Sequence, residues 1–255
     1  MGKIIAVANQ KGGVGKTTTC VNLCAALQEA GSRTLLCDMD PQGNATSGLG
    51  VDKNKDAPNI YNVLIEGIDA NEAIVNTPYG DVLPSNKILS GAGIELVTKV
   101  MREFVLSNVL SGCRDNYDFI LIDCPPSLEM LTLNSLCAAD SILIPVQCEY
   151  YALEGLTDLM TTIRMIKTAL NPNLDIEGVL LTMYDARTNF SAQVAAEIKR
   201  FFNQKMYHVT IPRNIRLAEA PSHGMPIMEY DRPSRGSLAY IELAKEIIKK
   251  NQNGH

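Results

Sequence analysis

A glycine-rich loop near the start of the 255-residue chain lies between an apolar run and a helical pattern. The loop, residues 11–18, reads Lys-Gly-Gly-Val-Gly-Lys-Thr-Thr, and residues 4–8 before it are apolar and typical of a short strand. After the loop, apolar side chains recur at the i, i+3, i+4, i+7 spacing of one helix face, at Cys20, Leu23, Cys24 and Leu27. A strand, a loop and a helix in this order are the context in which a glycine-rich loop binds phosphate.

The glycines of this loop suit the backbone of a phosphate site. Gly12, Gly13 and Gly15 let the chain turn sharply, so that N–H groups point at an anion, and the following helix adds its positive N-terminal end. The nucleotide contacts are therefore predicted to be Gly12, Gly13, Val14, Gly15, Lys16, Thr17 and Thr18.

Three side chains of the loop carry further chemistry. Lys16 is placed to reach the β- and γ-phosphates of a nucleotide, and the Thr17 hydroxyl is placed to ligate Mg²⁺. Lys11 is one lysine more than phosphate binding requires. On a single subunit it can equally be a solvated loop lysine.

Aspartates follow two later apolar runs. Asp123 follows the apolar run 119–122, which is the position of a Walker B acid that holds Mg²⁺. The Pro125-Pro126-Ser127 segment after it stiffens the backbone where the chain leaves the strand. Asp38 and Asp40 follow the run 35–37, and Asp38 is predicted with Asp123 on the metal side. Asp40 can orient the attacking water, or it can simply cap the turn on which it lies.

Apolar runs alternate with helical patterns along the whole chain. Strands are expected at 4–8, 35–38, 117–123, 141–146 and 176–183, and helices near 98–112, 152–170, 190–203 and 236–250. Near-continuous apolar strands separated by helices predict an α/β fold, a mainly parallel sheet with helices on both faces in three layers. Ligands bind such sheets at the carboxyl ends of the strands, where the aspartates fall. No internal repeat or linker divides the chain, so 1–255 is expected to form a single domain.

Composition favours a cytoplasmic protein. The N-terminus lacks the apolar core of a signal peptide, and no window approaches a membrane span. The seven cysteines are an odd number and fall mostly inside apolar patterns, so they are interpreted as buried thiols in a reducing compartment.

Charge is unevenly distributed. The net charge is −5, but residues 151–255 carry 13 basic and 11 acidic residues. Between positions 187 and 216 a single acid, Glu197, accompanies six basic residues, which are Arg187, Lys199, Arg200, Lys205, Arg213 and Arg216. A local positive excess in an acidic protein indicates either a surface for an anionic partner or ordinary solvated helix charges.

Several segments together resemble one protein family. They are 11–18, 38–46, 123–127, 147–155, 182–188 and 211–221. This ordered set resembles the deviant-Walker ATPases of the MinD/ParA group of P-loop NTPases (SIMIBI type), and within them the ParA/Soj-type chromosome partitioning proteins. The resemblance covers essentially the whole chain and implies ATP and Mg²⁺ as cofactors.

The resemblance also implies roles for the residues of the loop. Lys11 matches the signature lysine, which reaches the phosphates of a partner subunit in an ATP-sandwich homodimer. Lys16 matches the P-loop lysine, Asp40 the residue needed for hydrolysis, and Asp123 the Walker B acid. Two ATP molecules buried between subunits concentrate negative charge, which only cations from both sides can offset. In the family, adenine is positioned by residues around Met183 and Pro212.

For the basic segment, the resemblance implies sequence-independent binding to double-stranded DNA. Arg187 and Arg216 match DNA-binding arginines of the family, and Lys199, Arg200 and Lys205 are candidates to extend the surface. Family members hydrolyse ATP slowly, and a centromere-binding ParB/Spo0J-type partner stimulates them, so a cytoplasmic, nucleoid-associated protein is expected, with no membrane partner. The chain lacks the separate N-terminal helix-turn-helix region of some plasmid relatives.

Three other classes share the glycine loop. A MinD-like membrane-cycling ATPase would need a lipid-inserting helix at its end, whereas residues 236–250 predict a helix docked on the domain, with basic residues at its C-terminal end. A nitrogenase-type reductase would need two cluster-ligating cysteines, and Cys124 has no matching partner. A metabolic ATP-dependent ligase would need a substrate pocket, which the sequence does not locate.

Overall fold

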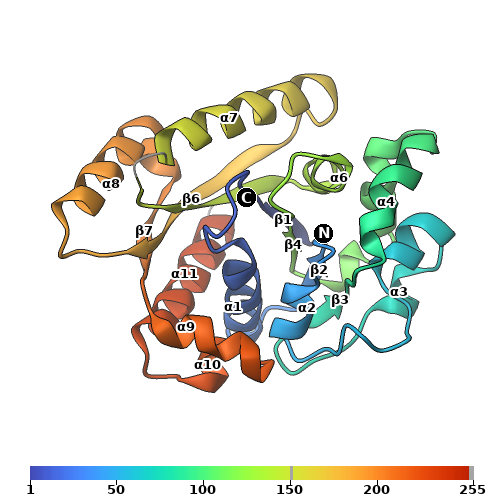
Figure 1. Cartoon of the computed structure of the whole chain (residues 1–255), viewed down its shortest axis with the longest axis horizontal. Coiled ribbons are helices and arrows are strands. Elements are labelled where there is room, and N and C mark those ends of the chain that lie inside the picture. Colours follow the sequence, from blue (N-terminus) through green and yellow to red (C-terminus); the bar gives the residue numbers. More distant parts are fainter. Residues whose placement is uncertain (150–151, 253–255) are drawn as a thin grey trace.

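A parallel sheet forms the centre of the protein (Figure 1). The computed structural model describes residues 1–149 and 152–252. Within them seven strands pair in the order β3-β2-β4-β1-β5-β6-β7, every neighbouring pair parallel. The strands are β1 Lys3–Val7, β2 Thr34–Asp38, β3 Asp81–Leu83, β4 Phe119–Asp123, β5 Ser141–Gln147, β6 Asp175–Tyr184 and β7 Met206–Pro212.

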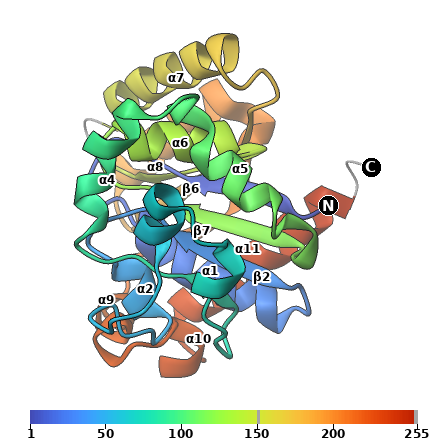
Figure 2. The same cartoon turned by 90° about the vertical axis from the view of Figure 1, so that its right-hand side faces the viewer.

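Helices cover both faces of this sheet, as Figures 1 and 2 show. One face carries α1 Lys16–Glu29, α2 Asn44–Gly48, α9 Ile215–Glu219, α10 Ile227–Tyr230 and α11 Arg235–Gln252. The other carries α3 Ala70–Ala73, α4 Leu89–Glu95, α5 Val105–Ser111, α6 Met130–Ala138, α7 Ala152–Ala169 and α8 Asn189–Phe202. Short 3-10 turns occur at Leu96–Thr98, Arg102–Phe104, Arg114–Asn116, Asn203–Lys205 and Ala220–His223, and a π-helical turn at Asn62–Glu66.

The burial pattern explains this layering. All five residues of β2 and all five of β4 are buried, because helices exclude water from both sides of these strands. The predicted stripe of α1, from Cys20 to Leu27, is fully buried against the sheet. The predicted α/β class, with a parallel sheet between two helical layers, is confirmed.

Among the described residues, two strands and six helices were not predicted: β3 and β7, and α2, α3, α4, α6, α9 and α10. β3 has only three residues. β7 reads Met-Tyr-His-Val-Thr-Ile-Pro and has exposed and half-buried positions, so its sequence does not form an apolar run. Helix α6 was missed because it is only nine residues long.

The predicted helix at 98–112 is wrong in length. The chain there forms the 3-10 turn Arg102–Phe104 followed by the short α5. Met101 has a φ of 52°, which is left-handed and incompatible with continuing a helix. The helices expected at 152–170, 190–203 and 236–250 match α7, α8 and α11 to within two residues at each end.

The C-terminal helix α11 docks on the domain as predicted. Tyr240, Leu243, Ala244 and Ile247 are buried against α1 and β7. Lys250 lies over the ring of Tyr207, 5.4 Å from its centroid. No helix of the described residues is long and apolar enough to cross a membrane.

Candidate functional site

The glycine loop follows β1 at the carboxyl edge of the sheet, and Asn9 fixes its start. Asn9 is 6% exposed; its Nδ2 donates to the carbonyl oxygen of Pro145 on β5 (2.7 Å), and its Oδ1 accepts the N–H of Lys11 (3.0 Å). The sequence did not point to Asn9. An asparagine directly after a strand, two residues before the loop, is the turn-forming signal that could have found it.

The loop has the backbone that its glycines predict. Gly13 and Gly15 have φ values of 76° and 89°, in the left-handed region where other residues are strained. The Thr182 hydroxyl on β6 donates to the carbonyl oxygen of Val14 (2.8 Å), which ties the loop to the opposite half of the sheet. The exposed Gly12 and Gly13 leave the mouth of the loop open.

Lys16 is buried beneath the loop as the first residue of α1. Its Nζ donates to the carbonyl oxygen of Lys11 (3.1 Å), so the ammonium lies across the loop. Burial lowers the pKa of Lys16, and the charge of Asp123 partly offsets that effect. An anion that enters the loop would therefore stabilise the charged form of this desolvated lysine.

Asp123 ends β4 and faces the start of α1. It is fully buried, and burial together with the charge of Asp38 raises its pKa well above its ordinary value, while a hydrogen bond from Thr17 opposes the rise. Its Oδ1 accepts a weak bond from the Cys20 thiol (3.5 Å), and its Oδ2 has no hydrogen-bond partner among the described residues. An unsatisfied buried carboxylate oxygen beside a threonine hydroxyl fits a divalent cation.

The described residues contain no cluster of three or more His, Cys, Asp or Glu side chains that could hold a metal. Mg²⁺ suits such a site, because it keeps several waters and takes phosphate oxygens with only one or two protein ligands. The predicted metal roles of Thr17 and Asp123 fit this chemistry and stay predictions.

Asp38 is placed differently from Asp123. Its Oδ1 accepts the N–H of Asp40 (3.1 Å), and its Oδ2 accepts both the N–H (2.8 Å) and the hydroxyl (2.7 Å) of Thr46. Burial raises the pKa of Asp38 to about 6, against the effect of these bonds. Asp38 therefore anchors the segment that carries Asp40, and its predicted contact with the metal stays a prediction.

Asp40 lies half-buried on that segment. Its Oδ1 accepts the N–H of Gln42 (2.9 Å), which is the turn-capping role considered from the sequence, and its other carboxylate oxygen bonds to no described residue. The Ser85 hydroxyl donates to the carbonyl oxygen of Asp40 (2.7 Å), and the Ser85 N–H donates to the Thr46 hydroxyl (2.9 Å). Thr46 and Ser85 were missed, because their contact spans 39 positions of the sequence.

Lys11 points away from its own loop. Its Nζ forms an ion pair with Oε2 of Glu149, in the segment after β5, and each side chain is 40% exposed. Tyr150 and Tyr151, which follow in the motif at 147–155, lie outside the described residues.

A cavity of about 360 Å³ opens beside the loop between β6 and β7. Met183 and Pro212, the two predicted base contacts, line it together with Gly15 and Thr18. Tyr184 pairs with Pro212 at the ends of these strands, and Met183 has a φ of 50°, a strained conformation for a non-glycine residue. The cavity therefore joins both predicted base contacts to the phosphate loop, and their contact with a nucleotide stays a prediction.

The predicted basic residues do not all share one surface. Arg187 is 89% exposed and pairs with Asp185 (2.8 Å), whereas Arg216 pairs with Glu219 (2.9 Å). Lys199 and Arg200 are exposed on the last turn of α8. Lys205 pairs with Asp175 (2.7 Å) at the amino end of β6, the opposite edge of the sheet from Arg187, so it does not extend that arginine's surface.

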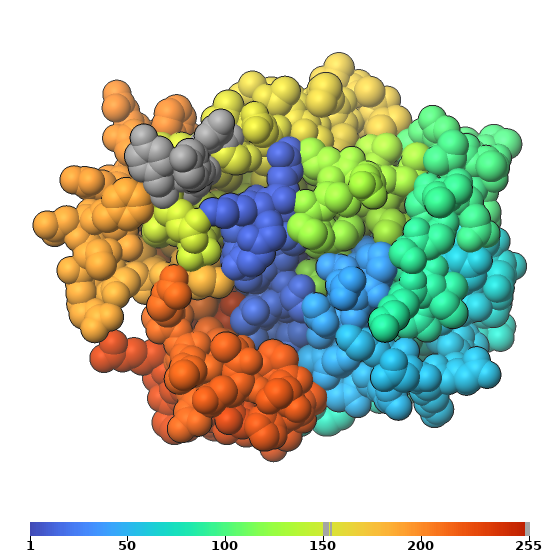
Figure 3. All heavy atoms as spheres, in the orientation of Figure 1, coloured from blue at the N-terminus to red at the C-terminus, as the bar shows by residue number. Residues whose placement is uncertain are grey.

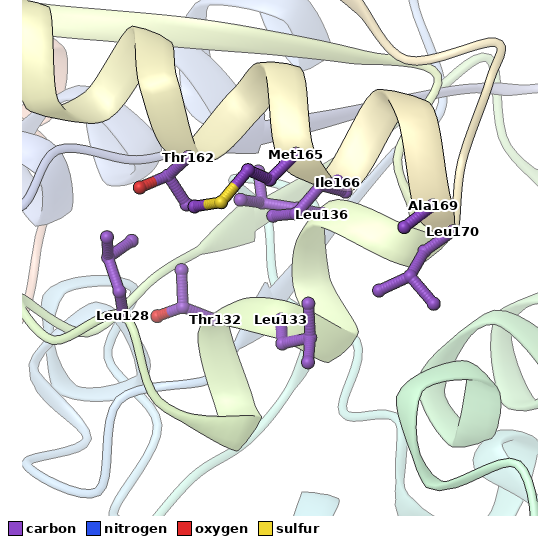
Figure 4. Close-up of a pocket in the computed structure, with 9 residues that line it drawn as sticks. All are labelled: Leu128, Thr132, Leu133, Leu136, Thr162, Met165, Ile166, Ala169 and Leu170. Atoms are coloured by element: carbon purple, nitrogen blue, oxygen red, sulfur yellow. The ribbon is translucent and has the colours of Figure 1, made fainter.

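An apolar groove of about 260 Å³ lies between α6 and α7, where Figure 4 shows Leu133, Met165 and Leu170 among its lining side chains. Its lining carries no charged residue. Thr132 and Thr162 are the polar side chains of this lining, and it lacks the charged groups with which a ligase would bind and activate a substrate.

The seven cysteines are free and buried, as predicted. Burial raises the pKa of the Cys124 thiol to about 12, as is typical of a thiol in the core.

A strand-loop-helix phosphate site, a buried acid at the end of the neighbouring strand and an additional lysine in the loop define a P-loop ATPase of the deviant-Walker class. Residues 2–176 match a family described as an AAA domain. The sporulation initiation inhibitor protein Soj of Bacillus subtilis is 56% identical over 249 residues (97% of this chain, 98% of that protein). The chromosome partitioning protein ParA of Myxococcus xanthus is 50% identical over 98% of this chain and 89% of its own length. The chain belongs to the ParA/Soj family of chromosome-partitioning ATPases.

Two solved structures bear on the fold and on the alternatives. Cobyrinic acid a,c-diamide synthase from Mycobacterium smegmatis, solved with ADP and magnesium, has a TM-score of 0.86 at 36% identity and covers 100% of this chain and 97% of that chain. The cell division ATPase MinD of Pyrococcus furiosus has a TM-score of 0.80 at 27% identity, with 98% and 99% covered. The synthase is named as a metabolic enzyme. The chain is 36% identical to it but 56% identical to Soj of Bacillus subtilis over nearly the same length.

Proposed function

We propose that Mg·ATP joins two copies of this chain into a dimer, that the dimer binds duplex DNA without sequence preference, and that hydrolysis returns it to monomers. A centromere-binding protein of the ParB/Spo0J type is the proposed partner that accelerates hydrolysis. The protein would then act in the cytoplasm on the nucleoid.

ATP and Mg²⁺ are the cofactors of this proposal. Support comes from the M. smegmatis structures, which carry ADP or an ATP analogue with magnesium. In this chain, residues 12–18 hold the phosphates, Thr17 and Asp123 hold the metal, directly or through water, and Met183 and Pro212 contact the base. The unsatisfied Oδ2 of Asp123 supports the metal assignment.

The placement of Lys11 carries the dimer proposal. Its own loop already contains the buried Lys16, while the side chain of Lys11 is 40% exposed and pairs, among the described residues, with Glu149. A lysine there can leave Glu149 and reach the phosphates of a second copy that faces it. Two triphosphates between subunits need cations from both sides, because buried negative charge is costly unless paired.

Hydrolysis is assigned to the segment that carries Asp40. One carboxylate oxygen caps the turn and the other remains available to orient a water for attack on the γ-phosphate. Asp38, Thr46 and Ser85 hold that segment in place.

DNA binding is assigned to Arg187 and Arg216, and Lys199 and Arg200, on the last turn of α8, are proposed to extend it. Such binding is to backbone phosphates and weakens steeply with salt, with a log–log slope of about 0.9 per phosphate contacted. Dimerisation doubles the number of contacts, which couples DNA affinity to ATP.

Size-exclusion chromatography with ATP, ADP or no nucleotide, each with and without duplex DNA, tests this proposal. The expected result is a dimer that forms with ATP but not with ADP or without nucleotide, and that co-elutes with duplex DNA. Lys16→Ala is expected to abolish ATP binding and to remain monomeric in every condition. A protein that stays monomeric with ATP, or an ATP dimer that does not bind duplex DNA at low salt, would contradict the proposal. Co-sedimentation with anionic lipid vesicles instead of DNA would favour the MinD-like alternative.

A further inference from the structure

A basic hollow of about 710 Å³ lies at the carboxyl ends of β6 and β7, beside the nucleotide cavity. Arginines from three separate segments line it: Arg187 from the turn before α8, Arg213 from the residue after β7, and Arg235 from the first position of α11. Figure 3 shows a notch on the left of the molecule, between the segment that leads into α8 and the C-terminal segments. These three arginines are here called the arginine triad.

Electrostatics favours an anion in this hollow. Asp185 is the one acid in its lining, and it already makes two bonds to Arg187, from Nε (2.9 Å) and from Nη2 (2.8 Å). Arg213 and Arg235 are exposed and form no ion pair with any described residue. The lining therefore carries an excess of two positive charges, both on guanidinium groups free to form forked hydrogen bonds.

Neutral polar groups complete the lining. The Thr210 hydroxyl and the Asn214 amide line the same hollow as the arginine triad. A phosphodiester presents two anionic oxygens and takes guanidinium forks and hydroxyl donors, so its chemistry matches this set. Arg216, by contrast, is held by Glu219 (2.9 Å) and Asp231 (3.5 Å) and does not line the hollow.

The hollow shares a wall with the nucleotide cavity. Pro212, Arg213 and Asn214 line both, and the Arg213 N–H donates to the carbonyl oxygen of Tyr184 (3.4 Å). A base bound between Met183 and Pro212 would therefore press on the segment that carries Arg213. We expect contact with the base on one side to restrict the movement of Arg213 on the other.

We propose that the arginine triad is a phosphodiester seat for the backbone of duplex DNA, in which Arg213 and Arg235 are binding residues in addition to Arg187. This inference rests on the proposed DNA-binding function and identifies where on each subunit the phosphates lie. Arg235 is 48 positions from Arg187 in the sequence, and the packing of α11 against β7 brings them together.

The test compares Arg213→Ala and Arg235→Ala with the matched control Arg164→Ala, which removes an exposed arginine from α7, outside the hollow. Binding of the ATP dimer to duplex is measured by fluorescence anisotropy from 50 to 300 mM salt. Each triad variant loses one contact per subunit and two per dimer, so it is expected to bind about tenfold more weakly at the lowest salt, with a salt slope lower by about 1.8. Arg213→Lys and Arg235→Lys are expected to recover the slope, since they keep the charge, but only part of the affinity.

ATP-dependent dimerisation of each variant, measured by size exclusion, shows that the chain is folded and competent. Wild-type binding to duplex is measured first: if it fails, the proposed function fails, whereas if it holds and the triad variants match Arg164→Ala, only the seat is refuted. Titration with inorganic tripolyphosphate separates a DNA backbone from a free polyphosphate. Loss of tripolyphosphate binding in the triad variants, with DNA binding unchanged, would also overturn the proposal.

Discussion

Lys11, the first residue of the phosphate loop, and Glu149 of the same chain form an ion pair. The pair joins the loop after β1 to the segment after β5, and both side chains are partly exposed. The lysine assigned to a partner's phosphates is therefore held in its own subunit before any partner arrives. In the proposed dimer, Lys11 would exchange Glu149 for the phosphates bound to the partner subunit.

Glu149→Gln is expected to lower the ATP concentration needed for half-maximal dimerisation. A half-exposed ion pair contributes about 0.5 kcal/mol, so the midpoint should fall about twofold. Analytical ultracentrifugation across an ATP titration measures it. Glu72→Gln, which removes an exposed acid from α3, is the matched control, and an equal shift in both variants would refute a specific role for Glu149.

Lys11→Ala is expected to keep ATP binding and to lose dimerisation and hydrolysis, because Lys16 alone serves the chain's own phosphates. A fluorescent ATP analogue measures binding, and size exclusion measures assembly. Lys245→Ala, on the exposed face of α11, serves as the control. A Lys11→Ala dimer at wild-type ATP concentrations would disprove the proposed contact between subunits.

Two substitutions separate the two roles of Asp40. Asp40→Ala is expected to slow ATP hydrolysis about 100-fold and to trap a DNA-bound dimer. Asp40→Asn keeps an oxygen that can accept the Gln42 N–H and loses only the charge, so it should be equally slow. Phosphate release measures both rates. If Asp40→Asn turns over like the wild type, Asp40 serves only to cap the turn.

The double variant Arg187→Ala/Arg216→Ala is expected to form the ATP dimer but to retain duplex DNA poorly. Loss of two phosphate contacts per subunit, four per dimer, lowers the salt slope by about 3.6. Gel shifts over a salt series measure the change. Arg33→Ala, which removes an exposed arginine near the start of β2, should leave DNA binding unaltered. Unchanged gel shifts for the double variant at low salt would contradict the assignment.

Glu177 predicts a pH dependence of stability. Burial raises the pKa of this carboxyl, but hydrogen bonds and charges from Lys3, Ser141 and Lys250 outweigh burial and leave the pKa below its ordinary value of 4.5. Its stabilising effect is therefore complete above about pH 4.5 and disappears as the pH falls through the lowered pKa. Glu177→Gln should cost about 2 kcal/mol in the free energy of unfolding at pH 7, because Lys3 and Lys250 lose their anion.

Urea unfolding of the wild type and Glu177→Gln at pH 7 and at pH 3.5 measures that difference. The gap between the two proteins is expected to shrink at the lower pH. An equal gap at both values would exclude an ionised Glu177 as its source.

The sequence predicted those parts of the site that depend on neighbouring residues. The glycine loop, the buried strand that ends in Asp123 and the stripe of α1 each follow from local spacing, and the structure has the elements where they were expected. Thr46 and Ser85 could not be predicted in the same way. Their contact with each other spans 39 positions, so only folding brings them together.

The same limit explains the errors in secondary structure. β7 is one edge of the sheet, so polar residues such as His208 and Thr210 break its apolar pattern. Lys205 fell within the basic segment by its position in the sequence, yet the 3-10 turn before β7 places it beside Asp175. A count of charges along the chain cannot show at which end of the strands a basic residue lies.

Asn9 has a consequence for how the energy of nucleotide binding is divided. Because its two bonds and the bond from Thr182 to Val14 already hold the loop in shape, little conformational entropy remains to be lost when ATP enters. The free energy of binding that loop ordering would otherwise consume stays available for bringing two subunits together. If the proposed dimer forms, a preformed loop would make the strength of subunit association, rather than the fit of the nucleotide, the quantity that ATP controls.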